Sequence, residues 1–137
     1  MGGSFDPVHL GHLRVALDVL QTLSIPRIKF IPCQQQVLKI QAPLDQIHRL
    51  AMLKLAIDGV QGFEVDEREL NRPAPSYTVD TLQALRKEYP THPLCFILGG
   101  DAAKSLEQWY HWPALFDLAH LIIVSRPAAD VTQLPWL

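Results

Sequence analysis

The sequence predicts an α/β fold in which a Rossmann-like parallel sheet carries helices on both faces. Short apolar runs alternate with stretches of helical period along the chain. The runs over residues 94–98 and 121–125 are almost purely apolar, which is typical of strands buried on both faces of a parallel sheet. Polar or glycine-containing loops follow the predicted strands, at the edge where such sheets bind ligands.

In the first half of the chain, leucines at three- and four-residue spacing predict a helix over residues 10–23. A short strand over residues 27–32 precedes a polar loop over residues 34–45, which is long enough to favour a binding role. Apolar residues at helical spacing then predict a second helix over residues 47–59. A weaker strand with acidic alternate positions follows over residues 63–66.

In the second half, Ser76 or Thr78 is placed to cap a helix that ends before Pro90. Two glycines and an aspartate then end the apolar run that follows this helix. The elements predicted after Pro90 are a strand, two helical stretches and a second strand, over residues 94–98, 102–108, 113–119 and 121–125.

Length and composition limit the classes of function. The 137 residues fit a single domain over 1–137, and 48% hydrophobic against 19% charged residues excludes a disordered chain. A formal charge of −2 offers no basic field for nucleic acid, and no apolar run approaches the roughly 20 residues that cross a membrane. No export signal is visible, so we expect a cytoplasmic protein. Cys33 and Cys95 belong to no C-x-x-C pair and lie beside apolar residues, so we expect both to be buried thiols. The pattern indicates no oligomeric state.

The opening segment carries the strongest chemical signal. Gly2 and Gly3 allow unusual backbone geometry and let a phosphate approach main-chain N–H groups. His9 and His12 are three positions apart at the start of the predicted helix, so their rings can point the same way. Gly11 leaves room for an anion, and the helix N-terminus adds partial positive charge. We interpret the segment as a phosphate cradle.

Two other interpretations of this segment stay open. The glycines can form a simple turn, with both histidines at the surface. His9 and His12 can also bind zinc, but no third ligand lies at helical or hairpin spacing, and Asp6 is the nearest carboxylate. We therefore assign no metal ligand.

Several segments together resemble one enzyme family. Residues 2–12 read Gly-Gly-Ser-Phe-Asp-Pro-Val-His-Leu-Gly-His, which is similar to the signature of H-x-G-H nucleotidyltransferases and specifically of bacterial nicotinate-nucleotide adenylyltransferases. Residues 73–78, 96–101 and 119–127 also match this pattern, as does the Trp-Tyr pair at 109 and 110. The resemblance implies a Rossmann-like enzyme of NAD biosynthesis. It would transfer AMP from ATP to nicotinate mononucleotide, with Mg²⁺, giving deamido-NAD and pyrophosphate.

The residues are compatible with this reaction, because the substrate phosphate is already a nucleophile and positioning must supply most of the rate. We expect His12 to contact the α-phosphate of ATP and His9 to help hold the phosphates, so both are candidate catalytic residues. The resemblance implies an ATP site that includes Gly2, Gly3, Ser4, Phe5, Gly11, Gly99 and Asp101. Asp101 could instead cap the helix that follows it.

The resemblance also implies a mononucleotide site, made of Lys39, Tyr77, Thr78, Trp109 and Tyr110. Trp109 would stack on the nicotinate ring, since a flat aromatic face binds and orients another ring. From the residues alone, core packing of Trp109 and Tyr110 and a solvated Lys39 are the favoured interpretations.

The chain departs from the family pattern in three places. The family has an apolar strand before the two glycines, and it ends with an I-S-S-T-x-I-R segment that opens a helix, so we expect a chain truncated at both ends and lacking that strand and helix. In the loop where the family reads P-P-H-K, this chain keeps only Lys39. Loss of both terminal segments would remove part of the charge that binds the triphosphate, so the sequence does not decide between an active and an inactive form. Phosphopantetheine adenylyltransferase, another H-x-G-H enzyme, and a non-catalytic nucleotide-binding remnant stay open as alternatives.

Overall fold

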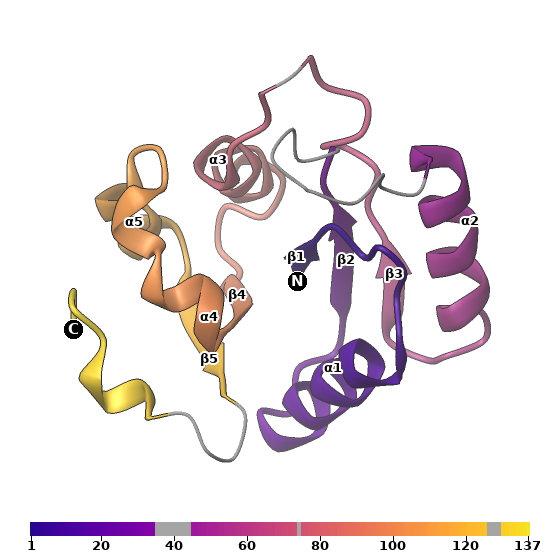
Figure 1. The fold of residues 1–137 in the computed structure, drawn as a ribbon, viewed down its shortest axis with the longest axis horizontal. Coiled ribbons are helices and arrows are strands. Elements are labelled where there is room, and N and C mark those ends of the chain that lie inside the picture. Colours follow the sequence, from indigo (N-terminus) through magenta and orange to yellow (C-terminus); the bar gives the residue numbers. More distant parts are fainter. Residues whose placement is uncertain (35–44, 74, 126–129) are drawn as a thin grey trace. The chain divides into compact units, whose positions relative to one another are not determined.

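The computed structural model of the chain describes residues 1–34, 45–73, 75–125 and 130–137 (Figure 1). Most of the predicted polar loop, including Lys39, lies outside the described residues. The backbone forms two compact units, Met1–Pro75 and Ser76–Leu137, and each is described by itself. The prediction of a single domain over 1–137 stays a prediction.

The first unit is a three-stranded parallel sheet with two helices. Its elements in chain order are β1 (Gly2–Gly3), α1 (Leu10–Thr22), β2 (Ile28–Pro32), α2 (Gln46–Ile57) and β3 (Phe63–Val65). The strands lie in the order β1-β2-β3, and each pair is parallel. Each parallel pair needs a connection that returns the chain to the same end of the sheet, and α1 and α2 provide these connections (Figure 1). The helices and strands predicted for this half are confirmed to within two residues at each end.

The core of the first unit is built around aromatic rings. Phe30 of β2 is fully buried, and its ring centroid lies 5.1 Å from that of Phe63 and 5.9 Å from that of Phe5. Ala16 of α1 and Leu53 of α2 are also fully buried, so both helices contribute residues to the core. Burial of each large side chain stabilises the unit by roughly 1.5–3 kcal/mol.

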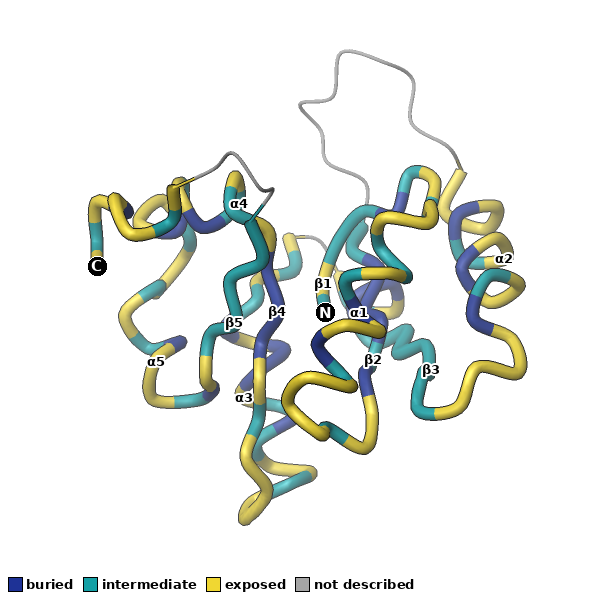
Figure 2. The backbone as a smooth tube through the Cα atoms, turned by 90° about the horizontal axis from the view of Figure 1, so that it is seen from below, coloured by how far each residue is buried: buried dark blue, intermediate teal, exposed yellow. Residues whose placement is uncertain are grey.

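The second unit is built around two parallel strands. Its elements are α3 (Thr78–Glu88), β4 (Cys95–Gly99), α4 (Gly100–Lys104), α5 (Leu115–Leu118) and β5 (His120–Val124), with short 3₁₀ helices at Leu106–Gln108, Trp112–Ala114 and Val131–Gln133. Cys95 pairs with His120 and the register continues along both strands to their ends. The middle of β4 is buried (Figure 2), as its apolar sequence predicted.

Three expectations are wrong, and all but the one for Cys33 concern the second unit. The residue that caps α3 is Tyr77, which makes no side-chain hydrogen bond, and not Ser76 or Thr78. Cys95 is exposed because it is the first residue of β4, at the strand end, and Cys33 is only half-buried. The stretch predicted as one helix over 102–108 is divided at Ser105, whose hydroxyl donates to the carbonyl of Ala102 and so competes with the helical pattern.

The first unit also has an apolar groove of about 490 Å³ beside α1. The residues that line it are Leu10, Leu13, Arg14, Leu17, Val60 and Phe63. Neither predicted catalytic histidine lines this groove. Among the described residues, no helix has the length and apolar character needed to cross a membrane.

One arginine ties three segments of the second unit together. Arg86 of α3 donates from Nη1 to the carbonyl oxygens of Tyr89 and His92, at 3.2 and 2.7 Å. Its Nη2 donates to the carbonyl oxygen of Leu118 at the end of α5, at 2.7 Å. The guanidinium therefore satisfies carbonyl groups at two helix ends and in the loop that leads to β4.

We predict that Arg86→Met lowers the free energy of unfolding by about 1.5–3 kcal/mol, because hydrogen bonds from a charged donor are lost and the carbonyls keep no replacement. Urea denaturation measures this change. Lys87→Met is the matched control, since Lys87 is the exposed neighbour on the same helix, and it should change stability by less than about 0.5 kcal/mol. Equal losses in the two variants would contradict the role given to Arg86.

Candidate functional site

The loop between β1 and α1 is anchored by one buried ring. Phe5 is only 1% exposed, and its backbone has φ +46°, in the left-handed region that a residue with a Cβ enters at a cost of roughly 1–2 kcal/mol. The prediction of unusual backbone geometry at Gly2 and Gly3 is wrong, since both lie in β1 without a positive φ. Because the Phe5 ring is buried, any contact between Phe5 and a ligand must come from its main chain.

The two histidines cap α1 through their own ring nitrogens. The N–H of Gly11 donates to Nδ1 of His9, and the N–H of His9 donates to Nδ1 of His12, each at 3.1 Å. The two rings are stacked with centroids 3.8 Å apart and 27° between their planes. The prediction that both imidazoles point the same way is therefore confirmed.

These hydrogen bonds decide where the neutral rings carry their protons. Nδ1 of His9 and Nδ1 of His12 both accept, so in the neutral form of each ring the proton is assigned to Nε2. Each Nε2–H is then a hydrogen-bond donor on the side of the ring away from the backbone that the ring caps. Two such donors side by side suit the oxygen atoms of an anion.

The environment of His12 favours its neutral form. Burial lowers the pKa of His12 below its usual range, and the neighbouring His9 lowers it further. The Phe5 ring lies edge-on to His12 with centroids 5.1 Å apart, which accounts for part of this burial. At neutral pH, His12 therefore acts as a hydrogen-bond donor without carrying a charge.

Gly11 is required by the histidine cap. A Cβ at this position would lie 2.8 Å from Cε1 and 2.9 Å from Nδ1 of His9, which is closer than such atoms approach in proteins. Any other residue at this position would push the His9 ring away from the N–H that it accepts. The space that sequence reasoning left for an anion is thus occupied by the first histidine.

Sequence reasoning missed a buried arginine in the first unit. Arg49 of α2 is 2% exposed, and its Nη1 donates to the carbonyl oxygens of Ser4 and Cys33, at 2.6 and 3.0 Å. The signal was present in the sequence, because Arg49, Leu53 and Ile57 are four residues apart and form the buried line of this helix. An arginine in the core-facing row of a helix is unusual, and this position alone makes it a candidate functional residue.

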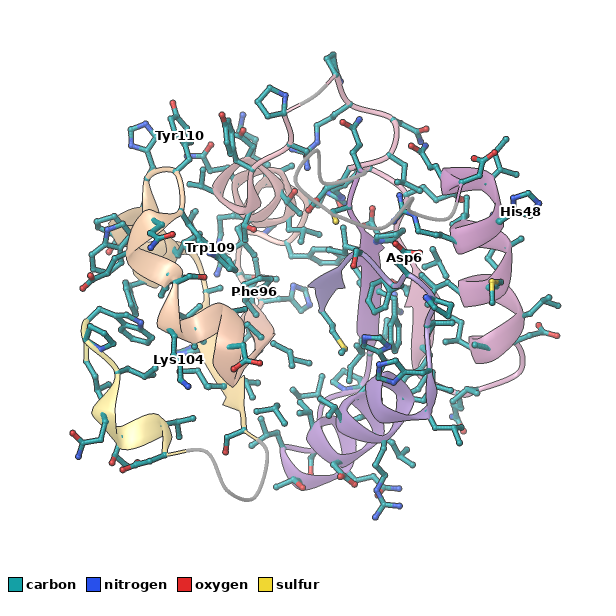
Figure 3. All side chains as sticks on the ribbon, in the orientation of Figure 1. Asp6, His48, Phe96, Lys104, Trp109 and Tyr110 are labelled. Atoms are coloured by element: carbon teal, nitrogen blue, oxygen red, sulfur yellow. The ribbon has the colours of Figure 1, made fainter. Side chains whose placement is uncertain are left out.

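Four of the predicted mononucleotide residues lie in the second unit. Tyr77 and Tyr110 are stacked with centroids 4.4 Å apart, and Thr78 is the first residue of α3. Trp109 is half-buried and meets Phe96 of β4 edge-on, with centroids 6.1 Å apart (Figure 3). Tyr77 and Tyr110 are thus brought together, whereas Trp109 turns to the β4 side chain. The fifth residue, Lys39, lies outside the described residues.

Gly99 and Asp101 lie where β4 passes into α4. Gly99 caps α4 and has open space where a Cβ would be, while Asp101 is exposed in the first turn. The alternative that Asp101 caps the helix is wrong, because the helix begins at Gly100, two residues earlier than predicted. In the described parts of the chain, no group of three or more His, Cys, Asp or Glu side chains is arranged to hold a metal ion.

Known proteins share most of this sequence. The sequence model of the family described as Cytidylyltransferase-like matches residues 1–136. The protein named "Probable nicotinate-nucleotide adenylyltransferase" from Pseudoalteromonas atlantica is 49% identical over 126 residues, which make up 92% of this chain and 58% of that protein. A protein of the same name from Aeromonas salmonicida is 48% identical over 127 residues, or 93% of this chain and 59% of that protein. The chain therefore spans less than two thirds of the length of these relatives.

A solved structure shares the fold. It is titled as the Plasmodium falciparum nicotinic acid mononucleotide adenylyltransferase complexed with NaAD, and it superposes with a TM-score of 0.71 at 18% identity. The superposition covers 94% of this chain and 74% of that one. The predicted Rossmann-like α/β fold is thereby confirmed.

We predict that the protein loses stability as the pH falls below about 6.5, the ordinary pKa of histidine. Because the pKa of folded His12 is lowered, the unfolded chain takes up a proton before the folded chain does, so protonation favours unfolding between the two values. Urea denaturation across this pH range measures the effect.

In His12→Gln this contribution to the pH dependence should disappear. His48→Gln is the control, because His48 is exposed on α2 (Figure 3), and it should keep the pH dependence of the parent. An unchanged pH slope in His12→Gln would contradict the assignment.

We also predict that Gly11→Ala displaces the His9 ring with little change in stability. Alanine favours the helix by about 1 kcal/mol over glycine, while loss of the side-chain cap costs about the same. Imidazole ¹⁵N NMR should show that Nδ1 of His9 no longer accepts a hydrogen bond. Gly99→Ala, where a Cβ meets open space, should leave these signals unchanged, and unaltered His9 signals in Gly11→Ala would refute the cap geometry.

Proposed function

Since the chain belongs to the cytidylyltransferase-like family, we propose that it carries the nucleotide site of an enzyme that transfers AMP from ATP to nicotinate mononucleotide. The products would be deamido-NAD and pyrophosphate. The observation that carries this proposal is the pair of stacked histidines at the start of α1, whose Nε2–H groups form a double donor for phosphate oxygens. The names of the two relatives described above support the choice of substrate.

The proposed reaction needs no base. An oxygen of the mononucleotide phosphate attacks the α-phosphorus of ATP, and a new P–O bond forms. The bond from that phosphorus to the bridging oxygen breaks, and its electron pair leaves with pyrophosphate. Because the nucleophile is already ionised, the site must bind, align and stabilise negative charge.

The first unit supplies the donors for this chemistry. In the proposal, His12 donates from Nε2 to an oxygen of the α-phosphate, and His9 donates to the phosphates that leave. A neutral histidine is suited to this role because it donates a hydrogen bond without repelling its stacked neighbour. Main-chain N–H groups of Gly2, Gly3 and Ser4 are the further proposed contacts of ATP.

Mg²⁺ would enter with ATP. This ion keeps several waters and binds through substrate phosphates in enzymes of this kind, so a dedicated protein cage is not required. Mg²⁺ would neutralise part of the charge that develops on pyrophosphate.

The second unit carries the other proposed substrate contacts. Tyr77, Thr78, Trp109 and Tyr110 are the proposed contacts of the mononucleotide, and the exposed aromatic faces suit a pyridine ring. Gly99 and Asp101 are proposed to lie along ATP, where the open space at Gly99 admits a ligand. Lys39 remains a proposed substrate contact, and a cytoplasmic location remains a prediction.

We predict that the protein releases pyrophosphate from ATP and nicotinate mononucleotide, and that His12→Ala lowers kcat by about 10²–10³-fold because one preorganised donor is lost. A coupled pyrophosphate-release assay measures this rate. His48→Ala is the control on an exposed histidine and should retain full activity.

The same assay with nicotinamide mononucleotide and with phosphopantetheine tests the substrate choice. Faster turnover of phosphopantetheine would replace the proposed function with that of the other H-x-G-H enzyme. Calorimetry that finds mononucleotide binding without turnover would identify a non-catalytic nucleotide-binding protein instead.

A further inference from the structure

We propose that Arg49 is a positioning residue that supplies fixed positive charge to the phosphate site. Its guanidinium donates to the carbonyl of Ser4 in the loop between β1 and α1, and its charge is compensated when an anionic polyphosphate binds at that loop. This inference rests on the proposed function, because it takes the opening segment to be the phosphate site. It adds a residue outside the opening segment, on a different helix.

The position of Arg49 links two neighbouring strands. Ser4 directly follows β1 and Cys33 directly follows β2, and a single nitrogen of Arg49 donates to the carbonyl oxygens of both. These two points lie at the carboxyl ends of parallel strands, which is the edge where sheets of this kind bind ligands. One side chain from α2 thus fixes the spacing of two loops at that edge.

The hydrogen bond to Ser4 also sets the direction of a main-chain donor. The peptide unit that joins Ser4 to Phe5 is planar and trans, so its C=O and N–H groups point in opposite directions. Because the Ser4 carbonyl points at Arg49, the Phe5 N–H points away from it. The buried Phe5 ring leaves that N–H as the means by which Phe5 can contact a phosphate.

The guanidinium is not neutralised in the part of the chain that the structure describes. No described carboxylate forms an ion pair with Arg49. Its Nε and Nη2 are buried and have no hydrogen-bond partner among the described residues, although together they form the edge that matches a carboxylate or phosphate. A buried charge in this state costs stability, so packing alone does not explain why an arginine occupies the position.

The charge requirement follows from His12. This residue is neutral at pH 7, so its ring contributes a donor but no net charge to the proposed triphosphate site. The guanidinium of Arg49 is positively charged and donates to the Ser4 carbonyl of the same loop. In a buried setting its field is weakly screened, so it attracts a polyphosphate even without direct contact.

The test separates charge from hydrogen bonding at position 49. Arg49→Gln keeps a side-chain N–H donor on a shorter side chain and removes the charge, whereas Arg49→Lys keeps both a donor and the charge. Binding of inorganic tripolyphosphate is measured by calorimetry at constant ionic strength. We expect Arg49→Gln to weaken binding about tenfold, and Arg49→Lys to stay within about threefold of the parent.

Arg86→Gln is the matched control. Arg86 also donates to main-chain carbonyls, but it lies in the second unit and has no place in the proposed phosphate site. Its loss should lower stability and leave tripolyphosphate affinity unchanged. Equal affinity in Arg49→Gln and the parent would overturn the proposal, and so would an Arg49→Lys variant as weak as Arg49→Gln.

A measurement on the unaltered protein covers the case in which Arg49→Gln does not fold. The ¹⁵N signal of Arg49 Nε should shift when tripolyphosphate is added, while that of Arg86 stays in place, and an unmoved Arg49 signal at saturation would overturn the proposal. If the parent does not bind tripolyphosphate at all, the phosphate site and the proposed function both fail. If tripolyphosphate binds as expected but nicotinate mononucleotide is not adenylylated, the role of Arg49 stands and the substrate assignment fails.

Discussion

The opening loop depends on the burial of the Phe5 ring against Phe30. Residues around this ring have to turn the chain from a parallel strand into a helix within six positions. The packed ring holds the Phe5 backbone in a left-handed conformation that is unfavourable without such packing. The same ring makes an edge-on contact with the His12 ring. Without this packing, neither the direction of the loop nor the start of α1 would be fixed.

Two kinds of polar group surround that loop, and they differ in burial and in charge. His9 is exposed, His12 is half-buried and neutral, and backbone N–H groups orient both rings. Arg49 is buried, charged and held by two backbone carbonyls. Neutral groups can approach a ligand closely without mutual repulsion, while a buried cation keeps its field because water does not screen it. This difference between the histidines and Arg49 explains how one short segment can pack compactly and still attract anions.

Periodicity was sufficient for most of the fold. The leucine spacing located α1, and the pure apolar runs located β4 and β5, because burial on one face or on two leaves a clear mark in the sequence. Local hydrogen bonding was less predictable. Ser105 interrupted a predicted helix through its own hydroxyl, and Tyr77 capped α3 although two hydroxyl residues stood beside it.

The candidate site was predicted in part for the same reason. The spacing of His9 and His12 was enough to expect that their rings lie together, because a helical turn brings such positions onto one side. The left-handed residue was expected at a glycine and was found at Phe5, since a buried ring can stabilise a conformation that local preference disfavours. Arg49 was missed because the partners of its side chain are main-chain atoms far away in sequence.

The contact between His9 and Gly11 has a consequence for how the segment can change in evolution. The glycine is there to accommodate the imidazole, so the two positions constrain each other more than either constrains the rest of the helix. A descendant that replaced the histidine by a smaller residue would free the glycine to drift toward alanine. A descendant that kept His9 would tolerate almost no substitution of Gly11.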